Sequence, residues 1–197
     1  MNADAVRAAY DAVCTEAGPG VTVVAATKYV AAEDMRILAD AGVAIAGENR
    51  AQDLQRKHAL HADAFRWHFI GALQSNKARI VNELCELVHA VETDSTARRL
   101  TVPWLLEVNL SGEESKSGVA ESEIEGYLER YPLLRGLMTM PPFADAPEAS
   151  RPTFRRLAEL ARANGLTELS MGTSQDWRVA VEEGSTLIRV GSTLFRD

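Results

Sequence analysis

The chain has 197 residues, of which 46% are hydrophobic and 25% are charged, and its formal net charge at pH 7 is −7. This composition is typical of a soluble globular protein, and the length suffices for one sizeable core, so we expect a single domain over residues 1–197. The acidic balance argues against a nucleic-acid partner, which needs clustered basic side chains. No apolar run approaches the roughly 20 residues that cross a bilayer, so we also expect no membrane association.

The first twenty residues predict a helix and no targeting signal. Apolar residues recur there at helical spacing, namely Val6, Tyr10, Val13 and Ala17. The pattern ends at Gly18-Pro19-Gly20. The two cysteines, Cys14 and Cys85, lie far apart without metal-ligand spacing, which favours core thiols and a cytoplasmic location.

Short apolar runs alternate with helical patterns along the rest of the chain. The runs predict eight strands, at residues 21–28, 43–49, 66–73, 87–93, 103–110, 133–140, 167–173 and 185–192. A helical pattern such as residues 152–165, with Phe154 and Leu157 on one face and Gly165 as its stop, lies between successive strands. Eight such units predict an α/β protein with a single (β/α)8 TIM-type barrel, whose bottom the N-terminal helix would cover.

The main alternative is a doubly wound open sheet, which would need a glycine-rich turn after its first strand. That turn reads "TKYVAAEDM" and contains no glycine, which favours the barrel. The connection at residues 94–102 is short for a parallel crossover with a helix. Either its helix is trimmed or residues are missing from it, and the pattern does not decide between the two.

Lys28 closes the first predicted strand, "VTVVAATK", at the end where barrel enzymes carry their reactive groups. With a period of two, its side chain shares the inner face with Thr22, Val24 and Ala26. Burial there would lower the pKa of the amine and prepare it for Schiff-base chemistry with a carbonyl ligand. The ordinary alternative is a lysine that extends from the strand end into solvent.

Arg189 alternates with Leu187 and Gly191 on the last predicted strand, so it too would enter the barrel mouth. A buried arginine requires fixed partners. Two turns rich in glycine and hydroxyl residues follow the last two strands, at 172–174 and 191–193. Barrel enzymes often bind phosphate in these two loops, so together the turns predict a phosphate site.

A lysine, an arginine and a phosphate cradle at one mouth describe a site for pyridoxal 5′-phosphate. The chain resembles the pyridoxal-phosphate homeostasis protein family, which has the fold-type III barrel of the alanine racemase N-terminal domain. The resemblance spans nearly the whole chain and rests on "ATKYV", "GENRAQD", "WHFIGALQSNK", "VNLSGEESKSGV", "LRGLMTM", "LSMGTSQDW" and "IRVGSTLF".

The resemblance implies roles for seven residues. Lys28 would be the Schiff-base lysine, and Arg189 would face the pyridine nitrogen. The phosphate would be held by Ser174, Gly191 and Ser192. The resemblance further implies that Asn49 and His68 line the cofactor pocket, a role that the pattern of residues alone does not indicate, since a lone histidine on an apolar strand is often a core residue.

Two stretches depart from known patterns. Many family members carry a proline-containing turn where this chain has Tyr29 and Val30. The stretch "GEESKS" imitates a P-loop, but Ser115 replaces the glycine that would precede Lys116, so we reject a P-loop there. Lys116 is then expected to be a charged loop residue at the mouth.

We weigh three functions. The leading hypothesis is a carrier that holds pyridoxal 5′-phosphate reversibly on Lys28 and delivers it to apo-enzymes without substantial catalysis. The second is an amino-acid racemase, but related racemases supply a tyrosine from a further domain, and period two would turn Tyr29 away from Lys28. The third is a barrel enzyme for a phosphorylated sugar or aldehyde. Without the dimer contacts of a racemase, we expect a monomer.

Overall fold

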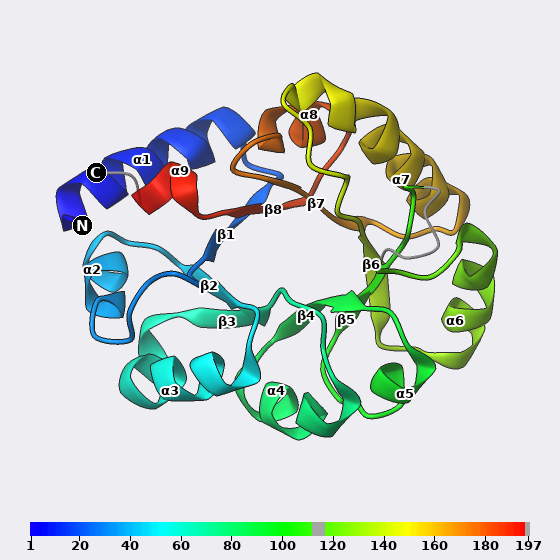
Figure 1. The fold of residues 1–197 in the computed structure, drawn as a ribbon, viewed down its shortest axis with the longest axis horizontal. Helices are drawn as coiled ribbons and strands as arrows, with labels where there is room; N and C mark the ends of the chain where they lie inside the picture. Colours follow the sequence, from blue (N-terminus) through cyan, green and yellow to red (C-terminus); the bar gives the residue numbers. More distant parts are fainter. Residues whose placement is uncertain (112–116, 196–197) are drawn as a thin grey trace.

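Eight parallel strands close into a barrel around which the helices form a ring (Figure 1). The computed structural model describes residues 1–111 and 117–195. The strands are β1 (Thr22–Ala26), β2 (Ile45–Glu48), β3 (Arg66–Phe69), β4 (Leu87–Val91), β5 (Trp104–Glu107), β6 (Leu134–Met138), β7 (Glu168–Thr173) and β8 (Leu187–Val190). Every neighbouring pair is parallel, and β1 pairs with β8 through Thr22–Leu187 to Ala25–Val190. Each predicted strand contains one observed strand, so the predicted barrel is confirmed.

The described residues form α-helices that vary in length from one turn to four. They are α1 (Ala3–Ala17), α2 (Met35–Asp40), α3 (Ala51–His61), α4 (Ala78–Leu84), α5 (Asp94–Ala97), α6 (Ile124–Arg130), α7 (Arg151–Ala163), α8 (Trp177–Glu182) and α9 (Ser192–Phe195). Short 3₁₀ turns add η1 (Ala62–Ala64), η2 (Ser75–Lys77), η3 (Glu121–Glu123) and η4 (Pro147–Ser150). None of these helices is long and apolar enough to cross a membrane.

The strands alternate their side chains between two apolar layers because successive residues point to opposite faces. Val23 and Ala25 belong to the larger layer, which packs between the strands and the helices. Leu105, Met138 and Leu187 belong to a smaller cluster inside the barrel. The small interior cluster leaves room for polar side chains along the barrel axis.

The prediction that α1 covers the bottom of the barrel is wrong. α1 packs beside α2, α9 and β1 in the outer ring of helices (Figure 1). Because α9 is only one turn long, it leaves the flank of β8 and β1 uncovered, and α1 fills that space. Asn2 caps α1 by accepting a hydrogen bond from Asp4 N, and Gly18 ends the helix with a φ of 86°.

The short connection after β4 contains a trimmed helix. α5 has four residues, and Thr93 caps it by accepting from Thr96 N at 3.3 Å. The chain runs through residues 94–102 without interruption. Of the two alternatives left by the sequence, the trimmed helix is the one observed.

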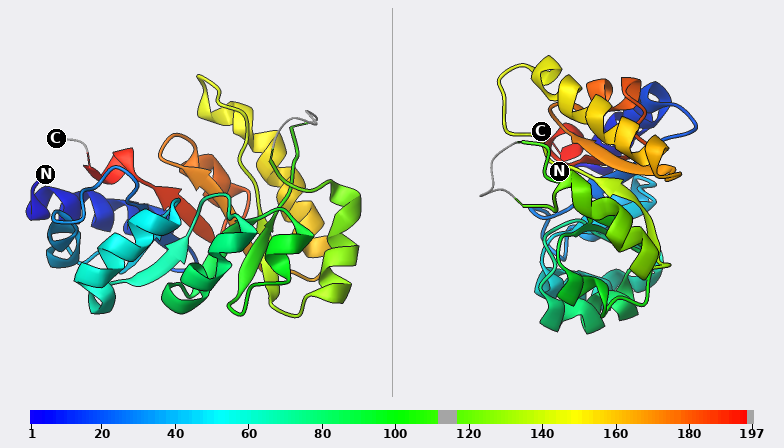
Figure 2. Two further views of the ribbon diagram at one scale, coloured as in Figure 1. Left: turned by 60° about the horizontal axis from the view of Figure 1, so that its bottom comes forward. Right: turned by 90° about the vertical axis from the view of Figure 1, so that its right-hand side faces the viewer.

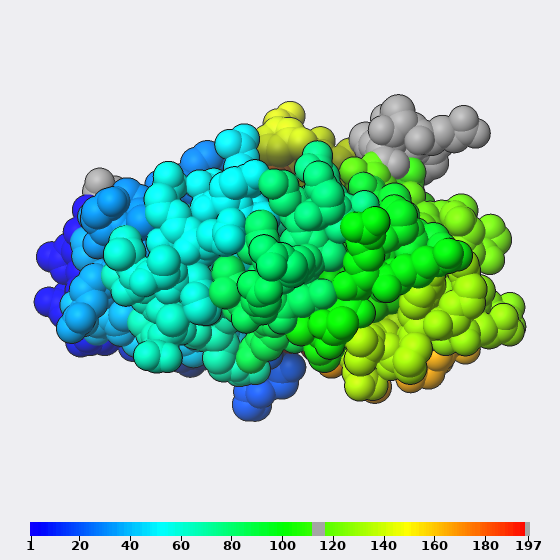
Figure 3. Space-filling view, turned by 90° about the horizontal axis from the view of Figure 1, so that it is seen from below, coloured from blue at the N-terminus to red at the C-terminus, as the bar shows by residue number. Residues whose placement is uncertain are grey.

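The barrel has two distinct ends. We call the end formed by the loops that follow the strands the mouth, and the end formed by the loops that precede them the floor. The segment between β6 and η4 projects on the mouth side, opposite the turn between α1 and β1 (Figure 2). In Figure 3 these two segments lie at opposite edges, in yellow and blue. The site predicted from sequence must therefore lie at the mouth, on the side where the segment between β6 and η4 projects (Figure 2).

Candidate functional site

Lys28 lies at the mouth, two residues after β1 ends at Ala26, in a turn closed by a hydrogen bond from Val30 N to Thr27 O at 2.8 Å. The predicted alternation holds along β1, whose Thr22 lines a cavity at the floor and whose Val24 is fully buried. The predicted burial of Lys28 is wrong, because the strand stops before it and the side chain is exposed. Its amine is thus open to ligands from solvent.

The side chain of Tyr29 lies beside that of Lys28. The alternation of a strand predicts instead that Tyr29 points away from Lys28, so that prediction is wrong. Lys28 Nζ is 4.8 Å from the centroid of the Tyr29 ring, and Tyr29 is itself 88% exposed. The alternation of a strand no longer applies in the turn, so the two side chains can share one side. An ammonium over an aromatic face is a favourable contact of about 0.5–1 kcal/mol at exposed sites.

A buried ion pair supports the turn that carries Lys28. Lys57 Nζ, from α3, donates to Glu48 and also to Thr27 O at 2.7 Å. Thr27 Oγ1 donates to the same Glu48 oxygen at 2.5 Å. The contacts join β1, β2 and α3 directly beneath Lys28. Sequence reasoning missed this group, since nothing local distinguishes the buried Lys57 from the exposed charged residues of α3.

Arg189 enters the barrel from β8, as predicted. Its side chain is buried, and Nη1 donates to Ser170 O at 3.0 Å and to Ser170 Oγ. Nη2 donates at 3.2 Å to Thr139 O and to Met140 Sδ, both just beyond β6 at the mouth. Burial lowers the pKa of Arg189 to about 10, which nearby Glu107 partly offsets, so the guanidinium remains a cation at neutral pH.

The loops after β7 and β8 meet at Ser174. Its Oγ accepts from Gly191 N at 2.9 Å and from Thr193 N at 3.2 Å, and Thr193 Oγ1 donates to Ser174 O at 3.4 Å. A Cβ on Gly191 would lie 3.0 Å from Ala26 O, so only glycine fits comfortably against β1 here. Ser192 is exposed as the first residue of α9. Converging N–H groups of this kind bind phosphate oxygens.

Asp176 fixes the shape of the first of these loops. Its Oδ1 accepts from Thr173 N at 2.8 Å and from Thr173 Oγ1 at 3.1 Å, and its Oδ2 accepts from Ser150 Oγ at 2.8 Å. Gly172, near the end of β7, has a φ of 92°, and a Cβ there would lie 2.6 Å from Ala180 Cβ. The buried carboxylate thereby holds Ser174 in place.

Asn49 follows β2 at the mouth and lines a cavity of about 270 Å³ with Phe69 and Lys77, among others. Its Oδ1 is buried without a hydrogen-bond partner among the described residues. A Cβ on Gly71 would lie 2.5 Å from Asn49 Cβ, so the two loops pack closely. An unpartnered buried amide oxygen is costly, which fits a position that serves a ligand.

His68, which the resemblance places in the cofactor pocket, lies toward the floor of the barrel. It lines a floor cavity of about 440 Å³ together with Thr22 and Glu168, the first residues of β1 and β7. Both ring nitrogens are engaged, Nδ1 with His89 Nε2 at 2.9 Å and Nε2 with Glu86 Oε1 at 2.8 Å. His68 occupies the middle of β3, where its inward direction leads into the barrel and not onto a loop.

Glu107 is a further mouth residue that the sequence did not single out. It ends β5, is 6% exposed, and lies near Glu92 and Arg189. Burial, followed by repulsion from Glu92, raises the pKa of Glu107 to about 7, although Arg189 acts in the opposite direction. Lys116, which we expected nearby, lies outside the described residues.

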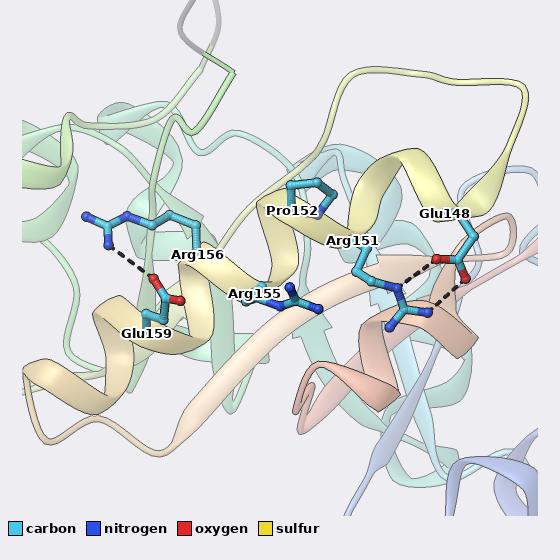
Figure 4. Close-up of a pocket in the computed structure, with 6 residues that line it drawn as sticks. All are labelled: Glu148, Arg151, Pro152, Arg155, Arg156 and Glu159. Carbon is cyan, nitrogen blue, oxygen red and sulfur yellow. Dashed lines mark hydrogen bonds and ion pairs between the residues drawn. The ribbon is translucent and has the colours of Figure 1, made fainter.

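A third hollow lies on the outer surface of α7 (Figure 4). It measures about 380 Å³ and is lined by arginine and glutamate side chains. Arg151 pairs with Glu148 and with Glu183 beyond α8, and Arg156 pairs with Glu159. These surface ion pairs tie α7 to its neighbours and present no reactive group.

The residues at the mouth match one class of ligand. An exposed amine at Lys28 can combine with a carbonyl, and N–H groups around Ser174 can hold a phosphate. Arg189 supplies a buried cation without an acceptor atom, and Asn49 offers an unpartnered oxygen. The donor set therefore fits a phosphorylated aldehyde with a ring nitrogen.

Comparison with known proteins places the chain in a family. The model of the family described as "Alanine racemase, N-terminal domain" matches residues 1–197. Proteins named pyridoxal phosphate homeostasis protein in Aquifex aeolicus and Pseudomonas aeruginosa are 36% and 39% identical to this chain. The alignments cover 92% and 89% of this chain, and 90% and 83% of those proteins.

Solved structures agree with this placement. PipY of Synechococcus elongatus PCC7942, solved with PLP bound, has a TM-score of 0.87 and 31% identity, covering 97% of this chain and 100% of that one. A lysine/ornithine decarboxylase of Vibrio vulnificus shares the fold alone, with a TM-score of 0.71, 16% identity and 62% of its length covered. The chain belongs to the alanine racemase N-terminal domain family and, within it, to the pyridoxal phosphate homeostasis proteins.

Proposed function

We propose that this protein binds pyridoxal 5′-phosphate, holds it reversibly through Lys28, and serves the intracellular supply of the cofactor, with delivery to apo-enzymes. When bound, the cofactor supplies an aldehyde that a free amine attacks reversibly. The observation that carries the proposal is the convergence of an exposed amine, a buried guanidinium and a set of N–H donors at one mouth. PipY, the similar protein solved with PLP bound, supports the choice of ligand.

Each mouth residue has a distinct task in this proposal. The N–H groups of Gly191 and Thr193, together with Ser174 and Ser192, hold the phosphate. Arg189 has no acceptor atom and stays positively charged, so it keeps a ring nitrogen beside it unprotonated. The exposure of Lys28 leaves its amine accessible, which suits a protein that must release its cargo.

The number of lysines makes the proposal easy to test. The chain contains four, namely Lys28, Lys57, Lys77 and Lys116. Because Lys57 is buried against Glu48, few amines compete for the aldehyde. Lys28→Ala protein mixed with the cofactor should lose the visible absorption of the covalent link, whereas Lys77→Ala protein should keep it. Borohydride reduction and peptide mass mapping should locate the adduct on Lys28 in the wild type. Equal labelling of wild type and Lys28→Ala protein would refute the proposal.

We further propose that catalysis is slight. Arg189 would keep a ring nitrogen beside it unprotonated, so the ring would be a weak electron sink and racemase chemistry would be disfavoured. Incubation of the loaded protein with L-amino acids, followed by chiral chromatography, should give no more D-isomer than Lys28→Ala protein gives. Turnover that depends on Lys28, and further on the neighbouring Tyr29, would instead establish the racemase alternative.

A further inference from the structure

A row of hydrogen bonds crosses the barrel interior from the mouth to the floor. Arg189 Nη1 contacts Ser170 Oγ, which lies 2.7 Å from His89 Nδ1. His89 Nε2 is 2.9 Å from His68 Nδ1, and His68 Nε2 is 2.8 Å from Glu86 Oε1. The residues come from β8, β7, β4 and β3 and from the turn before β4 (Figure 1). We call these five residues the relay.

The two ends of the relay fix the direction of every hydrogen bond in it. An arginine can only donate, so Ser170 Oγ accepts from Arg189, and its own hydrogen is free to donate to His89 Nδ1. His89 must then carry its proton on Nε2 and donate to His68 Nδ1. His68 in turn carries its proton on Nε2 and donates to the carboxylate of Glu86, which can only accept.

The electrostatics of the relay agree with this direction. Burial lowers the pKa of His89 well below its usual value, with His68 and Arg189 adding to the effect, so His89 is neutral. The hydrogen bond from His68 lowers the pKa of Glu86 to about 2, and Arg66 contributes as well. Glu86 is therefore a carboxylate at neutral pH.

We propose that Glu86, His68, His89 and Ser170 are positioning residues for Arg189, so that a carboxylate at the floor of the barrel sets how Arg189 holds the ring of the cofactor at the mouth. This inference rests on the proposed function for its cofactor, while the relay itself concerns residues of this chain alone. Its basis is the unbroken row of bonds and the single direction that its ends impose.

The orientation of the Ser170 hydroxyl determines whether Arg189 keeps a hydrogen-bond acceptor. If its hydrogen turned toward Arg189, two donors would face each other, and the guanidinium would lose that acceptor. His89 prevents this by accepting the hydrogen, and it can accept only because His68 and Glu86 hold its proton on the other nitrogen. Buried hydrogen-bonded networks of this kind are more rigid than their separate pairs suggest.

Other charged groups around the ends act without entering the relay. Glu107 on β5 and Asp176 after β7 lie near Arg189 and favour its charged form. Arg66 on β3 pairs with Glu86 at 2.7 Å. Ser170→Ala should leave these contacts in place, whereas Glu86→Gln also removes the charge that pairs with Arg66.

Two variants and one matched control separate the relay from general packing. Ser170→Ala removes the hydroxyl beside Arg189, and Glu86→Gln removes the charge at the floor while keeping the shape. Ser185→Ala is the control, because Ser185 is also a buried serine beside β7, and within the described residues its Oγ donates only to backbone oxygens, Met171 O at 2.8 Å among them.

The first measurement needs no cofactor. Long-range ¹H–¹⁵N spectra of histidine-labelled protein should show His68 and His89 protonated on Nε2 and not on Nδ1. In Glu86→Gln protein the amide can donate as well as accept, so His68 and His89 should show mixed protonation. Ser185→Ala protein should give the wild-type pattern.

The second measurement uses the bound cofactor. A cation near the ring nitrogen disfavours the protonated ring, so a looser Arg189 should move the pH midpoint of the cofactor's absorption upward. We expect a shift of about one pH unit in Ser170→Ala protein, a smaller shift in the same direction in Glu86→Gln protein, and none in Ser185→Ala protein. Cofactor affinity should fall about tenfold in Ser170→Ala protein.

The outcomes are distinguishable. Histidines protonated on Nδ1 in the wild type, or a midpoint in both relay variants equal to that of Ser185→Ala protein, would overturn the relay while leaving cofactor binding intact. If the wild type binds no cofactor, the proposed function fails, and the histidine spectra still decide whether the relay exists. Should Ser170→Ala protein not fold, Glu86→Gln protein at the floor carries both measurements.

Discussion

Lys57→Met protein should be less stable than the wild type by about 3–5 kcal/mol in its free energy of unfolding, because the change leaves Glu48 charged and unpaired in the core. Lys57 is 1% exposed, and Glu48 already has one oxygen, Oε2, without a partner among the described residues. The loss also removes the donor to Thr27 O beneath Lys28. Urea unfolding followed by circular dichroism measures the change.

Two further variants make this result specific. Arg56→Met changes the neighbouring position of α3, where the side chain is 64% exposed, and should cost about 0.5 kcal/mol or less. A double variant with Glu48→Met and Lys57→Met removes both charges and should recover most of the lost stability. Equal losses in the Lys57→Met and Arg56→Met proteins would show that the buried pair contributes nothing.

Glu107→Gln should stabilise the cofactor-free protein at pH 8 by about 3 kcal/mol in its free energy of unfolding. This is the free energy that corresponds to raising the pKa of Glu107 from 4.5 to about 7 on folding. The folded state binds the Glu107 proton more tightly than the unfolded state does. Wild-type stability from this group is therefore full below pH 4.5 and falls as the pH rises toward 7.

The measurement is the difference in unfolding free energy between wild type and Glu107→Gln protein as a function of pH. That difference should be near zero at pH 4, grow up to pH 7 and then level off. Glu33→Gln is the control, because it makes the same change of side chain at an exposed position, and it should show no such growth. A flat difference for Glu107→Gln would mean that the folded protein tolerates the carboxylate at no cost.

The barrel was predictable because its signals are local. Each strand is a short apolar run, and the alternation along β1 and β8 correctly directed Val24 and Arg189 into the interior. Where local signals stop, prediction failed. The alternation was extended to Lys28 although β1 ends at Ala26, and it therefore gave a buried lysine and a distant Tyr29.

Other features of the site escape sequence reasoning because they depend on contacts between residues far apart in sequence. Family resemblance predicts that His68 lines the cofactor pocket, whereas its observed partners are Glu86 and His89, which no spacing pattern links to it. Ser170 reads as an ordinary strand residue, yet it joins His89 to Arg189. Sequence singled out Arg189 and, by resemblance, His68, but it indicated neither Glu86 nor the contacts that connect these residues.

The position of the proposed phosphate cradle has a consequence for the stability of the protein against proteolysis. Ser174 bonds to the segment that follows β8, and Gly191 lies against Ala26 of β1, so the cradle sits at the seam where the first and last strands close the barrel. A ligand that binds only the closed form reduces the population of seam-opened molecules by the factor 1 + [L]/Kd. If the ligand binds there, its concentration would then set how long each molecule survives proteolysis.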